Sequence, residues 1–205
     1  MSRSRIVTVV LIAAGIVWTS TVVAAFSAIR RFESTPGLSA DAHATWPASS
    51  RVPRATGAST LVMLIHPQCS CSRASIKELE AIIDQSPRSM RTYVLVYRPA
   101  DAKAGWENTD VYRAATGLRR AQVIVDVDGS EAKRFGGFTS GQTYLYDGDG
   151  RLRFTGGITS LRGHEGLNRG RVDVIRIANA QETSATHPVF GCAITSKTTT
   201  RGARP

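Results

Sequence analysis

The sequence lacks the short motifs that identify several common catalytic and metal sites. Residues 163–166 contain a His-Glu pair, but Asn168 stands where a zinc protease has its second histidine. The two Asp/Gly turns at 126–129 and 147–150 lack the glutamate that closes a calcium loop. The glycine pairs fit no phosphate-cradling pattern, and no serine occupies a nucleophile elbow. These absences exclude the corresponding zinc, calcium, nucleotide and serine-hydrolase interpretations.

Acidic and aromatic residues are also scarce. The chain has 16 acidic against 26 basic residues, and 7% of its residues are aromatic. The ranges 1–58 and 191–205 hold 9 of the basic residues and only 2 of the acidic ones. Since no aromatic residues interleave with a basic stripe, we expect no nucleic-acid partner. Basic groups beside a membrane instead favour anionic lipid headgroups, at about 1 kcal/mol each.

Residues 6–29 form a run of 24 residues without a charge. At the rise of an α-helix this length spans the hydrocarbon core of a bilayer. Arg3 and Arg5 bound the run on one side, and Arg30 and Arg31 on the other. The run therefore predicts one transmembrane helix that anchors the protein in the membrane.

A cleaved signal peptide is the alternative to this anchor. Its apolar region usually has only about 7–15 residues, but Ala24, Ala25 and Ala28 supply a cleavage site. Arginine is balanced across the run, so the positive-inside rule does not set the orientation. Because the segment before the run is short, we expect the N-terminus inside and the main domain outside the cytoplasm, on the periplasmic side.

The rest of the chain divides by composition. A Ser-, Ala-, Thr- and Pro-rich stretch without apolar periodicity is typical of a linker. The expected parts are a membrane anchor at 1–31, a flexible linker at 32–58, a domain at 59–185 and a C-terminal tail with Cys192 at 186–205.

Strand and helix patterns alternate through the domain. Apolar runs predict strands at 60–66, 92–97, 122–127, 143–146 and 151–155. Helical spacing and stop signals predict helices at 72–85, 106–118, 130–135 and 168–180. This order predicts an α/β fold with a central mixed sheet, helices on both faces and a closing hairpin.

A cysteine lies where the first strand gives way to the first helix. The segment is His66-Pro67-Gln68-Cys69-Ser70-Cys71-Ser72-Arg73-Ala74. A thiol at the start of a helix lies at the positive end of the helix dipole, near unpaired N–H groups, and both lower its pKa. Arg73 adds positive charge. Because the thiolate attacks disulfides, Cys69 is the candidate nucleophile.

This turn resembles the active site of TlpA/ResA-type membrane-anchored thioredoxins, which have Cys-x-x-Cys-Arg-Ala between a strand and a helix. Cys69 matches their first cysteine, Ser72 their second, and Arg73-Ala74 the Arg-Ala pair after it. Residues 125–136 and 143–151 resemble the central strand and helix and the closing hairpin of the same family. An uncharacterised RedB-type group is a further resemblance. The resemblance implies a thioredoxin-like fold, thiol–disulfide oxidoreductase activity without a cofactor, and protein thiols or disulfides as partners.

Two positions depart from the family pattern. The second cysteine is Cys71, not residue 72, and residues two apart point to different sides of a helix. A Cys69–Cys71 bond would be strained, and it forms only if Cys69 stays outside the helix. The family also has a cis-proline before the hairpin, which aligns with Gly141 here. Losing this proline removes a wall that holds substrate backbone and keeps metal from the thiols.

Cys192 is the third cysteine, and it comes after the last predicted helix. We expect the tail to fold back so that Cys192 pairs with Cys71 or Cys69; a lone thiol is the alternative. His66 precedes the turn and either tunes the thiolate or is satisfied by backbone. The second functional hypothesis is a copper-binding module, because soft thiolates suit Cu(I); its ligands would be Cys69, Cys71 and a histidine such as His164.

Overall fold

A computed structural model describes residues 3–194 of the chain. The C-terminal part of the expected tail, 195–205, lies outside the described residues. The chain divides into two compact units, one formed by residues 1–35 and the other by residues 36–205.

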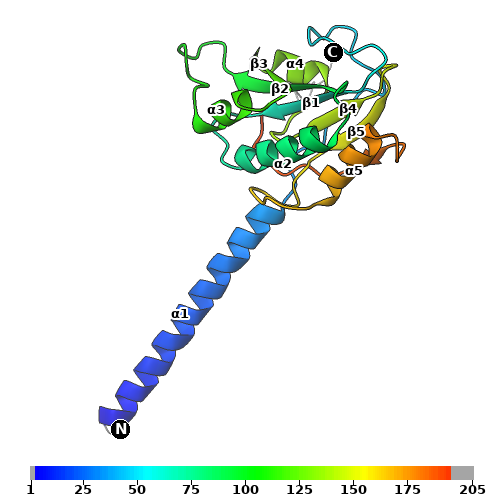
Figure 1. Ribbon diagram of the computed structural model, residues 1–205. Helices are drawn as coiled ribbons and strands as arrows, with labels where there is room; N and C mark the ends of the chain where they lie inside the picture. Colours follow the sequence, from blue (N-terminus) through cyan, green and yellow to red (C-terminus); the bar gives the residue numbers. More distant parts are fainter. Residues whose placement is uncertain (1–2, 195–205) are drawn as a thin grey trace, which may run out of the picture. The chain divides into compact units, whose positions relative to one another are not determined.

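The first unit is a single helix, α1, from Arg3 to Ser34 (Figure 1). None of its residues is buried within the unit, and its apolar side chains are exposed along its length. Several of its hydroxyl groups donate to the carbonyl four residues earlier, which satisfies them inside the helix: Thr8, Thr19, Thr21 and Ser27. The helix is long and apolar enough to cross a membrane.

The second unit contains one mixed six-stranded sheet in the order β3-β2-β1-β4-β5-β6. Strands β1, β2 and β3 are parallel, β4 runs antiparallel to β1 and β5, and β6 is parallel to β5. The strands are β1 (Thr60–Ile65), β2 (Arg91–Arg98), β3 (Ala121–Val127), β4 (Thr143–Tyr146), β5 (Leu152–Gly156) and β6 (Ala185–Thr186). The helices are α2 (Ser72–Gln85), α3 (Asp110–Thr116), α4 (Ser130–Arg134) and α5 (Arg169–Ala178).

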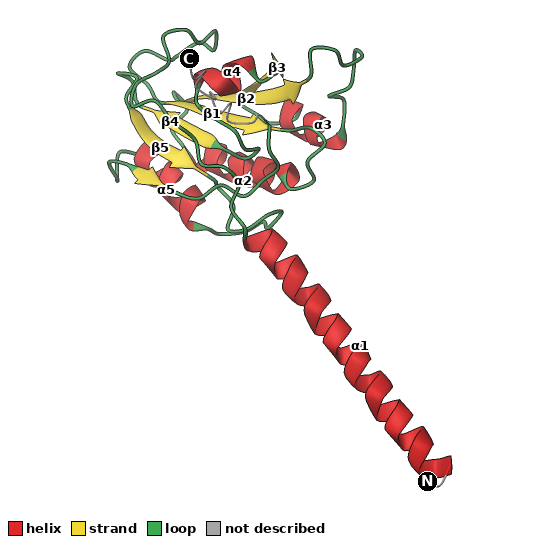
Figure 2. Cartoon of the chain, turned by 180° about the vertical axis from the view of Figure 1, so that it is seen from behind, coloured by secondary structure: helices red, strands yellow, loops and turns green. Residues whose placement is uncertain are grey.

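Helices cover both faces of this sheet (Figures 1 and 2). On one face, apolar residues of β1 and β2 pack with those of α2, α3 and α5 in a single core cluster. On the other face, a second cluster joins the sheet to α4 and to residues before β1. Every residue of β1 is buried, as expected of a central strand with both faces covered. The βαβ unit followed by a β-hairpin and a helix confirms the predicted thioredoxin-like fold.

One predicted helix is shorter in the structure than the sequence indicates. The pattern predicts helix from Trp106, whereas α3 begins at Asp110. Gly105 has a φ of 82°, in the left-handed region, so the chain turns before it becomes helical. Thr109 then caps the helix, since its hydroxyl accepts from the Tyr112 N–H.

Residues 36–58, for which the composition predicts a linker, lie against the α4 face of the domain. The Trp46 ring contacts Phe135 and Tyr146 edge-on, each at 5.1 Å between ring centroids. The Trp46 backbone N–H donates to the Gly150 carbonyl, and Val52 is 3% exposed. The segment therefore contributes to the second core cluster.

We predict that Trp46→Ala destabilises the domain by about 2 kcal/mol, because it removes buried ring area and two aromatic contacts. Thermal unfolding of the full-length protein in detergent, monitored by circular dichroism, measures the effect. Leu38→Ala is the control, since Leu38 lies in the same segment and is 47% exposed. Equal unfolding temperatures for the two variants would contradict the packing role of Trp46.

Candidate active site

The cysteine turn links the end of β1 to the start of α2. The Cys69 N–H donates to the His66 carbonyl, and the Ser72 N–H donates to the Cys69 carbonyl. Cys71 occupies the N-cap position of α2 and makes no side-chain cap bond. Cys69 therefore lies just outside the helix, on the turn that precedes its first residue.

The C-terminal segment 187–194, which we call the strap, crosses this turn. Its backbone is fixed at both ends: the His187 N–H donates to the Thr155 carbonyl, and the Ile194 N–H donates to the Phe138 carbonyl. In between, the Ser140 N–H donates to the Cys192 carbonyl. Gly191 is required for this contact, because a Cβ atom there would collide with the Ser140 carbonyl. The strap thus lies directly on the loop that precedes β4.

The strap places Cys192 against Cys69. The two Sγ atoms are 2.8 Å apart, although the residues are separated by 123 positions in the sequence. All three cysteines are free thiols in this structure. Cys69 is 2% exposed, whereas Cys71 and Cys192 are both partly exposed. The most buried cysteine of the site therefore contacts a second cysteine that is partly exposed.

The surroundings of Cys69 favour the ionised form of its thiol. Burial alone raises the pKa of the Cys69 thiol, but hydrogen bonds from the Cys192 side chain and backbone, the Cys71 backbone and the Ser72 hydroxyl outweigh it and lower the pKa overall. Burial and the bond to Cys69 raise the pKa of Cys192 to about 12. Of the two thiols, Cys69 therefore ionises more readily than Cys192.

Cys71 and Ser72 differ in their surroundings. Burial, with a smaller effect from the charge on Cys69, raises the pKa of Cys71. Ser72, which matches the second cysteine of the family motif, is 1% exposed. Its Oγ lies 2.8 Å from the Ser140 Oγ and 3.2 Å from the His66 carbonyl oxygen. Ser72 thus joins the cysteine turn to the loop before β4.

Gly141 lies beside this loop, at the position where the family has its cis-proline. Its φ is 89°, which proline cannot adopt, and its N–H donates to the Leu64 carbonyl at 2.7 Å. The backbone conformation at this position therefore favours glycine and excludes proline.

His66 and Arg73 are both held by neighbours. The His66 ring stacks on Tyr97 and meets Trp106 edge-on, and burial lowers its pKa. Arg73 forms an ion pair with Asp110 at the start of α3. The two residues fix the turn against β2 and α3.

His164 lies on an exposed loop between β5 and α5. Within residues 3–194, no group of three or more His, Cys, Asp or Glu side chains has the geometry to hold a metal ion. Cys69, Cys71 and His164, the ligand set suggested for copper, do not form such a group among these residues.

Arg162 is a site residue that the sequence does not indicate. Its guanidinium donates to the Gly191 carbonyl, next to Cys192 in the chain. Its positive charge acts to lower the pKa values of Cys71 and Cys192, against the larger effect of burial. No motif marks Arg162, because its position depends on the path of the loop after β5.

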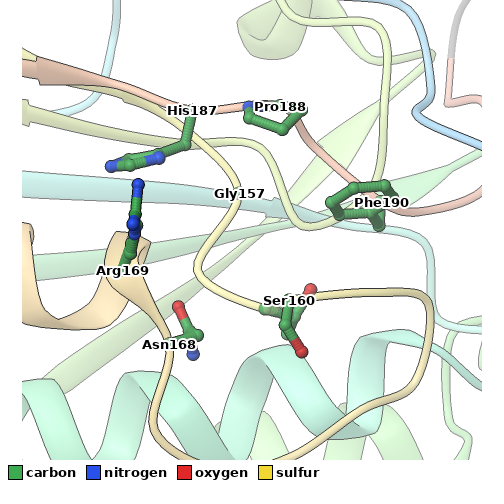
Figure 3. Close-up of a pocket in the computed structure, with 9 residues that line it drawn as sticks. Gly157, Ser160, Asn168, Arg169, His187, Pro188 and Phe190 are labelled. Atoms are coloured by element: carbon green, nitrogen blue, oxygen red, sulfur yellow. The ribbon is translucent and has the colours of Figure 1, made fainter. Parts of the chain in front are cut away.

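A pocket of about 440 Å³ opens beside the strap (Figure 3). Phe190 and Ser160 lie toward one end of it, and Arg169 extends toward His187 at the other. The His187 Nε2 is 2.6 Å from an Asp173 carboxylate oxygen. Since Phe190 is only two residues from Cys192, the pocket wall lies within about 7 Å of Cys192 along the chain.

Comparison with known proteins supports the fold. No family profile matches the sequence, and no curated protein does. A hypothetical protein from Sinorhizobium meliloti 1021 matches with 18% identity and a TM-score of 0.57, over 80% of this chain and 96% of that chain. An uncharacterized conserved protein from Geobacillus kaustophilus matches with 17% identity and a TM-score of 0.56, over 80% and 94%. At these identities the likeness concerns the fold alone.

We predict that Gly191→Ala displaces the strap, because the added methyl group meets the Ser140 carbonyl. The variant should lose about 2 kcal/mol of stability. Its thiolate absorbance at 240 nm should also titrate at higher pH, since the Cys192 donors move away from Cys69. Gly117→Ala is the control, because its Cβ makes only ordinary contacts far from the cysteines. An unchanged titration in Gly191→Ala would contradict the role of the strap.

Proposed function

We propose that the protein is a membrane-tethered thiol–disulfide oxidoreductase whose redox pair is Cys69 and Cys192. The observation that carries the proposal is the 2.8 Å approach of the two sulfur atoms at the strand-to-helix turn of a thioredoxin-like fold. As the Cys69–Cys192 bond forms, the dithiol form of the pair passes two electrons and two protons to the disulfide of a partner, which becomes two thiols. In the reverse direction the Cys69–Cys192 disulfide oxidises a partner dithiol and returns to two thiols. Protein thiols and disulfides are the proposed partners.

The surroundings of Cys69 support this chemistry. A thiolate is the reactive species in disulfide exchange, and the donors around the Cys69 sulfur stabilise that form. Cys192 supplies the second sulfur beside Cys69, whereas Ser72, at the position of the motif's second cysteine, contacts Ser140. The 123 positions that separate the two cysteines in the sequence do not prevent pairing, because backbone hydrogen bonds hold the strap beside the cysteine turn.

Helix α1 supports a location at the cell membrane. Its length, its exposed apolar side chains and its internally bonded hydroxyl groups suit a hydrocarbon environment. We place the second unit on the periplasmic side, where disulfides persist and where a redox pair of this kind finds disulfide-bearing partners.

We predict that Cys69→Ser and Cys192→Ser each reduce catalysed insulin-disulfide reduction to the uncatalysed background, because each removes one sulfur of the pair. Cys71→Ser should lower the rate much less. The assay uses the full-length protein in detergent with dithiothreitol as the electron source. Ser70→Ala is the matched control, since Ser70 is an exposed residue of the same turn. Full activity of Cys192→Ser would rule out the proposed pair.

A further inference from the structure

Cys69 and Cys192 differ in how exposed they are, and this difference determines which of them a partner can contact. Cys69 is 2% exposed and lies beneath the strap, while Cys192 is partly exposed on the strap itself. Disulfide exchange is an in-line displacement, so the attacking sulfur must reach the sulfur that it attacks. A partner thiolate can reach Cys192 with the strap in place, but it can reach Cys69 only after the strap leaves.

We propose that Cys192 is the catalytic residue that bonds to the partner, and that Cys69 is the buried sulfur that departs as thiolate. This inference rests on the proposed function, and it reverses the order usual for a cysteine at the start of this helix. The substrate class that it implies is a protein or peptide dithiol that the Cys69–Cys192 disulfide oxidises.

The exchange proceeds in two balanced steps. First, a partner thiolate attacks the Cys192 Sγ of the Cys69–Cys192 disulfide. A mixed disulfide forms on Cys192, the bond between the two protein sulfurs breaks, and its electron pair stays on Cys69 as thiolate. Second, the other thiolate of the partner attacks the partner sulfur of the mixed disulfide. The partner gains a disulfide, and Cys192 leaves and takes a proton.

The positions of the hydrogen-bond donors favour this direction of attack. Departure is fastest for the sulfur that best carries negative charge, and hydrogen bonds with the Cys71 backbone and the Ser72 hydroxyl lower the pKa of Cys69. Ser72 is a positioning residue in this scheme, because its buried hydroxyl is held by Ser140 at 2.8 Å and acts on the leaving sulfur without touching the partner. Attack at Cys69 would instead expel Cys192, whose thiol has the higher pKa and therefore leaves more slowly.

A pocket lies beside the strap that carries Cys192. The pocket is lined in part by His187, Pro188 and Phe190 of the strap (Figure 3), and Phe190 is two residues from Cys192. Arg162 holds the Gly191 carbonyl, so the strap stays in place while Cys192 is attacked.

The location of a trapped adduct tests this inference. The full-length Cys71→Ser protein is oxidised in detergent, mixed with glutathione as a single-thiol probe, and quenched with acid after a short time. Free thiols are then alkylated, and peptides are mapped by mass spectrometry. The Cys71→Ser background prevents the adduct from moving to a third thiol, and the unsubstituted protein is mapped alongside. We expect glutathione on Cys192 and the alkyl group on Cys69, in at least about tenfold excess over the reverse.

Glutathione found mainly on Cys69 would overturn the inference while leaving the proposed function intact. If no adduct forms and the protein has no disulfide-exchange activity in the insulin assay, the proposed function itself fails. A second measurement compares adduct formation in Ser72→Ala and Ser70→Ala. We expect a several-fold slower rate only in Ser72→Ala, and equal rates would contradict the assignment of Cys69 as the leaving sulfur.

Discussion

The hydrogen bonding of one buried sulfur atom determines how the rest of the site is arranged. Burial would normally keep the Cys69 thiol protonated, since a charged group loses its hydration there. The donors from Cys71, Ser72 and Cys192 replace that hydration and reverse the effect. Three separate parts of the fold must meet for this to happen: the turn after β1, the loop before β4 and the strap. The geometry of the sulfur therefore depends on the tertiary structure as a whole.

Backbone hydrogen bonds and close backbone contacts hold each of these three parts in position. The cysteine turn follows directly after the C-terminal end of the central strand β1. The Leu64 backbone hydrogen-bonds to both Gly141 and Gln142 in the loop before β4. Gly141 and Gly191 allow the backbones to approach where a side chain would prevent it. The strap then places Cys192 against Cys69, 123 positions away in the sequence.

The sequence predicts the sheet, its helices and the place of Cys69 well, because alternating apolar runs and the start of an amphipathic helix are local patterns. The extent of α3 is less predictable, because the turn at Gly105 competes with helical spacing. The packing of Trp46 has no periodic pattern, since it belongs to a segment without regular structure. The sequence leaves the partner of Cys192 open between Cys69 and Cys71, and the strap settles the contact through bonds between residues far apart in the chain. The role of Arg162 is likewise not predictable from the sequence, because its contact with the strap joins residues far apart in the chain.

The central claim is that Cys69 and Cys192 form one redox pair. The most direct test is peptide mapping of the oxidised, unsubstituted full-length protein under non-reducing conditions. The account predicts one disulfide, which joins the peptide containing Cys69 to the peptide containing Cys192, with Cys71 left as a free thiol. A bond between Cys69 and Cys71, or three free thiols after oxidation, would contradict it.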